Sequence, residues 1–281
     1  LKTDNNYDYL VPQSFTNSNQ SSIEPLSNNQ FEKKNLYLNN NLSFGTQKIR
    51  LTLQYNEQQK AIPNYQNNTP ENTSNLSSDT WRLGYRHSIY THLKWLDNLE
   101  FEAYQEHKTE RYLDILADVK RLDANYNTTK SHLDLTSSFI FNSQYGDLSV
   151  SPFIELNKQD FDSLSFNKNG QINCNGISSC DVIAQQTQWL IGSRFEWQQQ
   201  NTPLTAYSLM THLNEKNQNI PVNQSNAQTF NSDKDHQTQE VGIVYQAQHI
   251  KTELLASNGI RTPTLFELFG DRGLFKGSEE L

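Results

Sequence analysis

Long apolar runs are missing from this 281-residue chain, and cysteine, methionine, proline and glycine are all scarce. No stretch of eighteen apolar residues occurs, which excludes a transmembrane helix. The opening LKTDNNYDYL lacks the apolar core of a signal peptide, as it would in a mature secreted protein or an internal fragment. The net charge of −8 comes with no basic stripe, so nucleic acid is not an expected partner.

Sequence motifs of the common enzyme classes are missing as well. The chain has no Gly-x-Ser-x-Gly, no phosphate-binding glycine loop and no His-Glu-x-x-His. Its seven histidines are scattered, and the sequence does not decide whether His132 and His212 meet. We therefore expect no enzymatic activity, no cofactor and no metal site.

The two cysteines, Cys174 and Cys180, lie in NCNGISSC. Their spacing is not that of a zinc knuckle, and no histidine lies nearby in the sequence. Asn175 and Gly176 favour a tight turn between them. We expect a disulfide that clasps a loop, with two free thiols as the alternative. A disulfide would indicate an oxidising compartment.

In place of long runs, the chain has short segments in which apolar and polar residues alternate. In SHLDLTSSFIFN, Leu133, Leu135, Phe139 and Phe141 share one face. Period two indicates a strand, and two such runs around a short turn indicate a hairpin. Ten segments of about ten residues follow this pattern, in five hairpins: 35–44, 46–55, 80–90, 99–107, 131–142, 147–156, 187–197, 204–213, 237–246 and 249–257.

Long polar connections separate the predicted hairpins. Compact soluble domains rarely have such loops, yet here they occupy every second connection. In an up-and-down barrel, every second connection emerges at the same rim, so one rim has short turns and the other long loops. The sequence therefore predicts an all-β fold: an antiparallel up-and-down transmembrane β-barrel segment of about ten strands. Its long external loops would be 56–79, 108–130, 158–186 and 214–236.

The two faces of the predicted strands differ in charge. The apolar faces carry almost none and would meet lipid, with tyrosine and tryptophan near the strand ends as interfacial girdles. The opposite faces are charged and would line a wet lumen. They hold Lys48, Arg50, Arg82, Arg86, Glu100, Glu102, Asp134, Arg194 and Glu196. A soluble β-sandwich or β-solenoid with one wet face is the alternative.

Two stretches need separate interpretation. Residues 106–122 have rough helical spacing, so a short helix in the second long loop and a strand extended above the membrane both fit. Residues 259–281 are unusually apolar for an external loop, and we expect TLFELF to pack against the inner wall or a neighbouring loop. Arg261 and Glu267 lie six residues apart, so we expect each to pair with another strand, through Glu240 or Arg194, rather than with each other.

This closing stretch carries a resemblance to a known family. IRTPTLFELFG and then DRGLFKGSEEL resemble the strand-to-loop segment of TonB-dependent outer-membrane receptors. The pattern is aromatic-Arg-x-Pro-x-Leu-x-Glu-Leu-aromatic, followed by Gly-Asn-Pro-x-Leu-x-Pro-Glu. The matching residues are Arg261, Pro263, Leu265, Glu267, Leu268, Phe269, Gly277 and Leu281. Ile260, Ser278 and Glu279 depart from it.

The resemblance implies a fold and an activity. Barrels of the family have twenty-two strands around an N-terminal plug, which carries the TonB box gripped by the TonB complex. All of 1–281 would be part of one barrel domain, with the plug and the barrel C-terminus absent from it. The implied activity is TonB-dependent uptake of a siderophore, cobalamin, haem or metal complex across the bacterial outer membrane.

The implied partners are outer-membrane lipid, TonB through the missing plug, and a small-molecule or metal-chelate ligand. The ligand would bind the external loops, including 259–281, at residues that the sequence does not identify. Net negative charge mildly disfavours an anionic ligand, although local fields decide this. A passive porin or autotransporter barrel and a secreted β-rich adhesin are the competing hypotheses.

Overall fold

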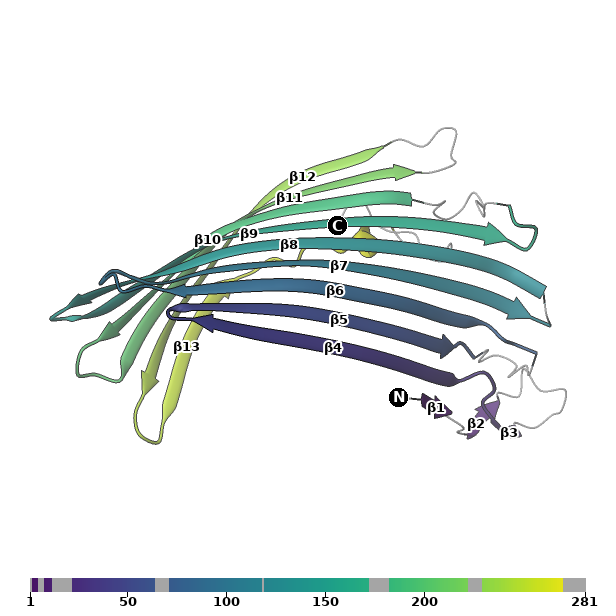
Figure 1. Ribbon diagram of the computed structural model, residues 1–281, viewed down its shortest axis with the longest axis horizontal. Coiled ribbons are helices and arrows are strands. Elements are labelled where there is room, and N and C mark those ends of the chain that lie inside the picture. Colours follow the sequence, from purple (N-terminus) through teal and green to yellow (C-terminus); the bar gives the residue numbers. More distant parts are fainter. Residues whose placement is uncertain are drawn as a thin grey trace.

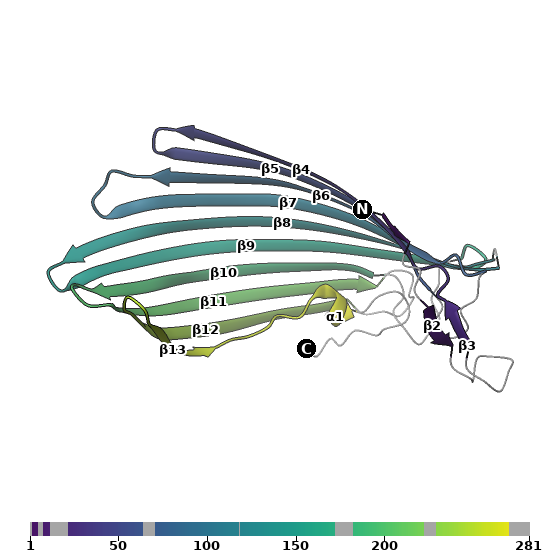
Figure 2. The same ribbon diagram turned by 90° about the horizontal axis from the view of Figure 1, so that it is seen from below.

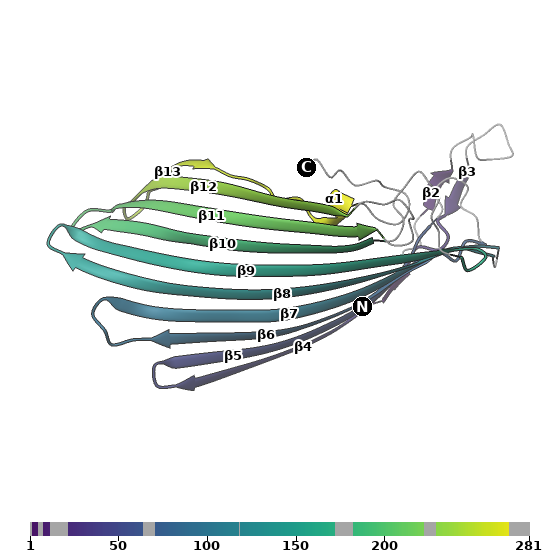
Figure 3. The ribbon, with the colours of Figure 1, turned by 90° about the horizontal axis from the view of Figure 1, so that it is seen from above.

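The computed structural model describes residues 2–4, 8–11, 22–63, 71–117, 119–171, 182–221 and 229–269. Its main element is an antiparallel sheet whose strands lie in chain order, β1-β4-β5-β6-β7-β8-β9-β10-β11-β12-β13. Figures 1 and 3 show the long strands side by side in one curved layer. The predicted all-β, up-and-down sheet of ten long strands is confirmed. The sheet is open, because β1 and β13 are its edges within the described residues.

The elements have the following bounds. The sheet contains β1 (Lys2–Asp4), β4 (Gln30–Phe44), β5 (Gln47–Ala61), β6 (Asn75–Tyr90), β7 (Leu96–Leu116), β8 (Val119–Ser143), β9 (Gly146–Asn167), β10 (Val182–Gln199), β11 (Leu204–Pro221), β12 (Phe230–Gln246) and β13 (Lys251–Asn258). A separate two-stranded sheet pairs β2 (Asp8–Val11) with β3 (Ser22–Pro25). One helix, α1 (Leu265–Phe269), follows β13.

Short turns at one end of the sheet join the predicted hairpins, and Figure 1 shows these turns together at the left. Gly45, between β4 and β5, has φ of +58°, which glycine adopts without a side-chain penalty. Gly146 begins β9, and a Cβ there would lie 2.4 Å from the carbonyl oxygen of Gln198. Glycine is therefore required at this turn by space.

The strands are longer than the sequence predicted. They contain 15 to 25 residues from β4 to β12 rather than about ten, so the predicted loops 108–130 and 214–236 are mostly strand, and strands extend into 56–79 and 158–186. The prediction was wrong about length because apolar and polar residues no longer alternate regularly along the strands beyond the predicted segments. Beyond the apolar zone, backbone pairing rather than alternation marks the chain as a strand.

The second predicted loop, 108–130, shows the extra strand length most clearly. Its residues continue β7 and β8 to a tight connection, where Leu116 pairs with Val119. The structure thus decides between helix and strand for residues 106–122 in favour of strand. Ladder bonds to neighbouring strands satisfy the backbone groups that an isolated helix would leave unpaired at its ends.

The outer face of the sheet is divided into an apolar and a polar zone. Counted from the short turns, the apolar zone ends at Leu36 on β4, Tyr55 on β5, Trp81 on β6, Leu156 on β9 and Val241 on β12; Leu164 lies apart from this zone, farther out on β9. Beyond them, away from the short turns, the outer positions hold Lys34, Glu57, Asp79, Lys158 and Gln239. The apolar side chains are exposed to the surroundings of the sheet, as the lipid-facing prediction requires.

This boundary also gives the slope of the strands. Following paired residues from Leu36 on β4 across the sheet leads to Asn231 on β12. The boundary on β12 lies ten residues nearer the short turns, at Val241. Ten residues of about 3.3 Å, set against eight strand spacings of about 4.8 Å, give a tilt of about 40°. Strands of membrane barrels tilt by about 35–45°, so the apolar zone has the slope of a membrane-spanning band.

The small apolar core lies on the other face, which we call the inner face. Leu265 and Leu268 of α1 are 1% and 2% exposed and pack on Ala184 of β10. Phe161 and Phe230 complete the cluster. Figure 2 shows the segment that runs from β13 to α1. The prediction that TLFELF packs on the inner wall is confirmed for Leu265 and Leu268.

Several predictions fall on residues outside the described ranges. The disulfide between Cys174 and Cys180 is one, and the motif residues Gly277 and Leu281 are others. The side chain of Phe269 is also outside them. Among the described residues, no helix is both long and apolar enough to cross a membrane.

Candidate functional site

The inner face concentrates charge at the height of the apolar band. One row of paired residues crosses five strands in order: Arg50, Arg86, Glu102, Asp134 and Glu155. Two guanidinium groups thus stand beside three carboxyl groups. Ionisable side chains at membrane height are costly unless water or partners compensate them. We therefore take this wall as the candidate functional site.

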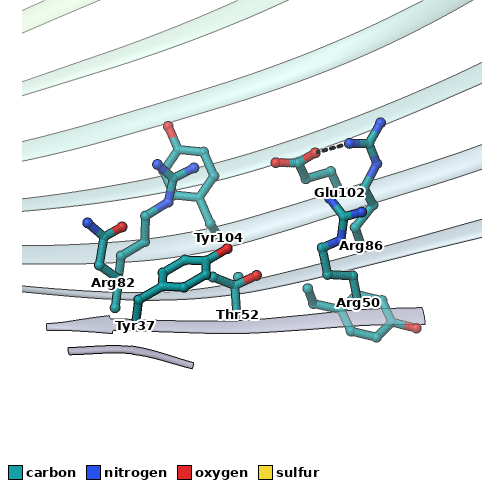
Figure 4. A pocket seen from close by; sticks show the side chains of 10 residues that line it. Tyr37, Arg50, Thr52, Arg82, Arg86, Glu102 and Tyr104 are labelled. Atoms are coloured by element: carbon teal, nitrogen blue, oxygen red, sulfur yellow. Dashed lines mark ion pairs between the residues drawn. The ribbon is translucent and has the colours of Figure 1, made fainter. Parts of the chain in front are cut away.

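A hollow of about 240 Å³ lies at the positive end of this row. We call it the arginine hollow. It is lined by Tyr37, Arg50, Thr52, Gln54, Arg82, Gly84, Tyr85, Arg86, Glu102 and Tyr104. Figure 4 shows Arg82 with Tyr37 and Tyr104 at one end and Arg50, Arg86 and Glu102 at the other. The lining comes from β4 to β7, so adjacent strands rather than loops position it.

The three arginines of the hollow differ in their partners. Arg86 forms ion pairs with Glu100 and, at 3.8 Å, with Glu102, so its charge is balanced. The guanidinium of Arg82 lies 3.7 Å from the centre of the Tyr104 ring, a cation–π contact. Arg50 donates from Nε to Oδ1 of Asn41 at 3.0 Å.

A second hollow of about 320 Å³ adjoins the first toward the short turns. Arg50 and Arg86 line both. Lys48 is also part of the lining, and its Nζ lies 5.0 Å from the centre of the Tyr90 ring. Positive charge therefore extends along the wall of β5 and β6, while the carboxylates begin on β7.

The segment after β13 is fixed to a different part of the wall. Gln186 donates to the carbonyl oxygen of Pro263 at 3.1 Å, and Gln188 donates to Oγ1 of Thr262 at 3.3 Å. Gln188 also donates to the fully buried carboxylate of Glu215 at 2.7 Å. The segment thus leaves the edge strand and reaches β10 across the inner face.

One prediction about this segment was wrong. Arg261 forms an ion pair with Glu267 rather than with a residue on another strand. Arg194 is paired instead with Glu196, at 3.1 Å. Helical spacing was the wrong measure, because α1 begins only at Leu265 and the chain before it is not helical. Six residues of partly non-helical chain allow the two side chains to meet.

Glu267 has a second role at the start of α1. Its carboxylate accepts a hydrogen bond from the backbone N–H of Thr264 at 2.9 Å, while Oγ1 of Thr264 accepts one from the N–H of Glu267 at 3.2 Å. This reciprocal pair is a capping box. The T-x-x-E spacing in TLFE was the sequence signal that would have identified it.

The motif residues therefore act together in part. Arg261, Glu267, Leu265 and Leu268 join in one capped and docked turn, and the carbonyl of Pro263 is bonded to the wall. The structure does not bring His132 and His212 together. His132 contacts Asn157 at 2.7 Å, while His212 lies on β11 beside Asp235. Within the described ranges, no three potential ligands are grouped to hold a metal ion.

Alternation in the sequence correctly predicted that the arginines of the hollow face the lumen, but the ligand was predicted to bind the external loops. Alternation identifies the face of a residue, whereas the hollow depends on the register between four strands. The usable signal was a glycine, Gly84, between Arg82 and Arg86 on one predicted strand.

No protein-family model matches the chain, and no curated protein matches its sequence. Solved structures do match its fold. The ferric citrate transporter FecA, in its unliganded form, gives a TM-score of 0.64 at 9% identity, over 83% of this chain and 38% of FecA. The alcaligin outer-membrane receptor FauA of Bordetella pertussis gives 0.60 at 10% identity, over 78% of this chain and 34% of FauA.

BauA, the ferric preacinetobactin receptor of Acinetobacter baumannii, gives a TM-score of 0.62 at 10% identity, over 80% of this chain and 39% of BauA. Identities this low establish the fold alone. This chain spans less than two fifths of the length of each of these three proteins, and its sheet has the fold of part of the barrel of TonB-dependent siderophore receptors.

Proposed function

We propose that this chain is part of the barrel wall of a receptor in a bacterial outer membrane. The receptor would take up a scarce solute, such as a ferric siderophore, cobalamin, haem or another metal complex. The observation that carries the proposal is the match in fold to FecA, FauA and BauA over about four fifths of the chain. No bond in the solute is broken in this activity.

The two faces of the sheet support a membrane location. The outer band slopes at the angle of membrane-spanning strands, and Trp189 and Trp197 lie eight residues apart on its outer face. Eight residues span about 26 Å along a strand, or about 20 Å of bilayer at a tilt of about 40°. The hydrophobic band of outer-membrane barrels is about 25 Å tall, which is similar.

We also propose that uptake is energised through TonB. A plug from another part of a longer chain would fill the lumen and carry the segment gripped by TonB. Residues 259–269 support an occupied lumen, because they lie on the inner wall at Gln186 and Gln188 instead of extending β13 along β12. The inner wall then binds and guides the solute.

Two other functions remain as outcomes of the test. A passive porin needs an unobstructed lumen, which the docking of α1 on β10 disfavours. A secreted adhesin needs a soluble outer face, which the exposed apolar band disfavours.

The test uses the full-length protein in bacterial cells. Membrane fractionation should recover it with the outer membrane, in a form that needs detergent for extraction. Uptake of radioactive iron from a panel of ferric chelates should require both this protein and TonB. Uptake that persists without TonB would favour the porin, and a protein that stays soluble without detergent would favour the adhesin.

A further inference from the structure

Three glycines lie at inner-face positions within the long strands, and two of them are covered by rings. A Cβ at Gly192 would lie 2.5 Å from Cζ of Phe153, and one at Gly242 would lie 2.4 Å from Cζ of Tyr207. An aromatic ring over a strand glycine protects the backbone and restores lost packing. These two glycines are therefore explained by their covering rings.

Gly84 has no such ring. The nearest side-chain atoms to a Cβ there would be Cβ of Thr52 at 3.7 Å and Cβ of Tyr104 at 3.9 Å. A glycine within a strand weakens the strand unless something uses the space it leaves. The space above Gly84 is the arginine hollow, which exposes the floor between Arg82 and Arg86 to the lumen.

Positive charge at this hollow is only partly balanced. Arg86 has its two glutamates. Across the described part of the chain, no carboxylate lies within 4.0 Å of the guanidinium of Arg50 or of Arg82. Arg82 is held by its contact with the Tyr104 ring, and Arg50 by one hydrogen bond to the amide of Asn41. Both guanidinium groups therefore keep N–H donors for another group. A planar guanidinium pairs best with a carboxylate or phosphate oxygen pair.

We propose that the arginine hollow binds a small organic acid that carries at least two carboxylates, one held by Arg82 and another by Arg50. Arg82 and Arg86 are four residues apart on β6, about 13 Å along the strand, and Arg50 is paired with Arg86. The two guanidinium groups without a carboxylate partner, those of Arg82 and Arg50, therefore stand at opposite ends of the hollow, as Figure 4 shows.

Size and surroundings narrow the ligand class further. The hollow holds about eight water volumes, since each water occupies about 30 Å³. Glu102 lies at the Arg50 end and repels a ligand with excess charge there, while Thr52 and Gln54 offer neutral hydrogen-bonding groups along the floor. A compact di- or tricarboxylate fits this arrangement better than a single compact anion.

This inference deepens the proposed function, because it names a solute chemistry for the lumen wall. It rests on that function only for the presence of water at the hollow. Binding to purified protein and uptake by cells are separate measurements, so the two proposals can fail separately.

The experiment titrates the purified full-length protein in detergent with citrate by calorimetry. Acetate, which reaches one end only, and inorganic phosphate, a single compact anion, are titrated in parallel. We expect citrate to bind at least tenfold more tightly than either. Arg50→Gln and Arg82→Gln should each weaken citrate binding at least tenfold, and Gly84→Val should do so by filling the floor.

The matched control is Arg194→Gln. Arg194 also lies over a tyrosine ring on the inner face, 5.1 Å from the centre of Tyr207, but Glu196 balances its charge. It should leave citrate affinity unchanged, and circular dichroism should confirm that every variant is folded.

Equal affinity in the wild-type protein and the two arginine variants would overturn the inference, as would equal binding of phosphate and citrate or no citrate binding at all. Citrate binding that is weakened in the Arg50, Arg82 and Gly84 variants and retained in Arg194→Gln would support it, even if no uptake by cells is found. That last outcome would count against the proposed function alone.

Discussion

The guanidinium of Arg111 donates two hydrogen bonds to Asp123, from Nε to Oδ1 at 2.9 Å and from Nη2 to Oδ2 at 2.8 Å. Lys120 donates to the same carboxylate at 3.1 Å. The pair joins β7 to β8 beyond the apolar band, near the tip that the sequence left open between helix and strand. Two parallel bonds of this kind fix geometry as well as charge.

The first prediction concerns the pH dependence of this tip. The hydrogen bond from Arg111 holds the pKa of Asp123 below its usual value; burial opposes this shift, and the bond from Lys120 adds to it. A lowered folded-state pKa gives stability that is present above the unfolded value of about 3.9 and is lost as pH falls through the folded value. Backbone exchange in 111–123 should therefore accelerate only in strong acid.

Asp123→Asn serves as the control for this prediction. The variant keeps the shape of the side chain but cannot titrate, so its tip should exchange faster at neutral pH and show no acid step. An acid step of the same size in the variant would assign the effect to another carboxylate.

The second prediction concerns the docked turn. Leu268 is 2% exposed against β10, so Leu268→Ala should cost about 2–5 kcal/mol of local docking free energy. Hydrogen exchange should rise in 259–269 and stay unchanged in β5 and β6. Leu254→Ala, at an exposed site on β13, is the control. Protection of α1 that survives Leu268→Ala would show that the polar contacts alone hold the segment.

The third prediction concerns the capping box. Glu267→Ala removes the acceptor of the Thr264 N–H and the ion pair with Arg261, and caps of this kind contribute about 1 kcal/mol. Glu267→Gln keeps the acceptor but loses the charge. Exchange of the α1 amides should therefore rise more in the alanine variant. Equal loss in both variants would assign the effect to the ion pair.

The fourth prediction compares two inner-face glycines. Gly192→Ala must displace Phe153, and also the backbone oxygen of Met210 at 2.8 Å, so it should destabilise the barrel by about 1–3 kcal/mol. Gly84→Ala meets only ordinary contacts and should be nearly neutral. The folded fraction that resists heating in detergent reports the difference. Similar losses of the folded fraction at the two sites would mean that the flexibility of the strand, rather than the space around the glycine, determines the effect.

Much of this fold could be predicted because period-two alternation is a local property. It identified both faces and the ten long strands, as at Leu133 and Leu135 on β8. It could not find the strand ends, since apolar and polar residues do not alternate regularly in β7 and β8 beyond the band. Alternation also could not predict the arginine hollow, because the neighbours of Gly84 come from other strands and their positions depend on the register between strands.

The order of the strands also bears on how the sheet is assembled. Every strand of the main sheet pairs only with its neighbour in that order, and no two ladder partners are farther apart in the chain than Gly146 and Gln199, at 53 residues. The entropic cost of loop closure therefore stays small at each step, so hairpins can add to the sheet sequentially. The bond from Gln186 to Pro263 spans 77 residues and needs β10 and β13 already in place. Docking of α1 should therefore follow the pairing of these strands, and kinetic labelling should find this segment protected last.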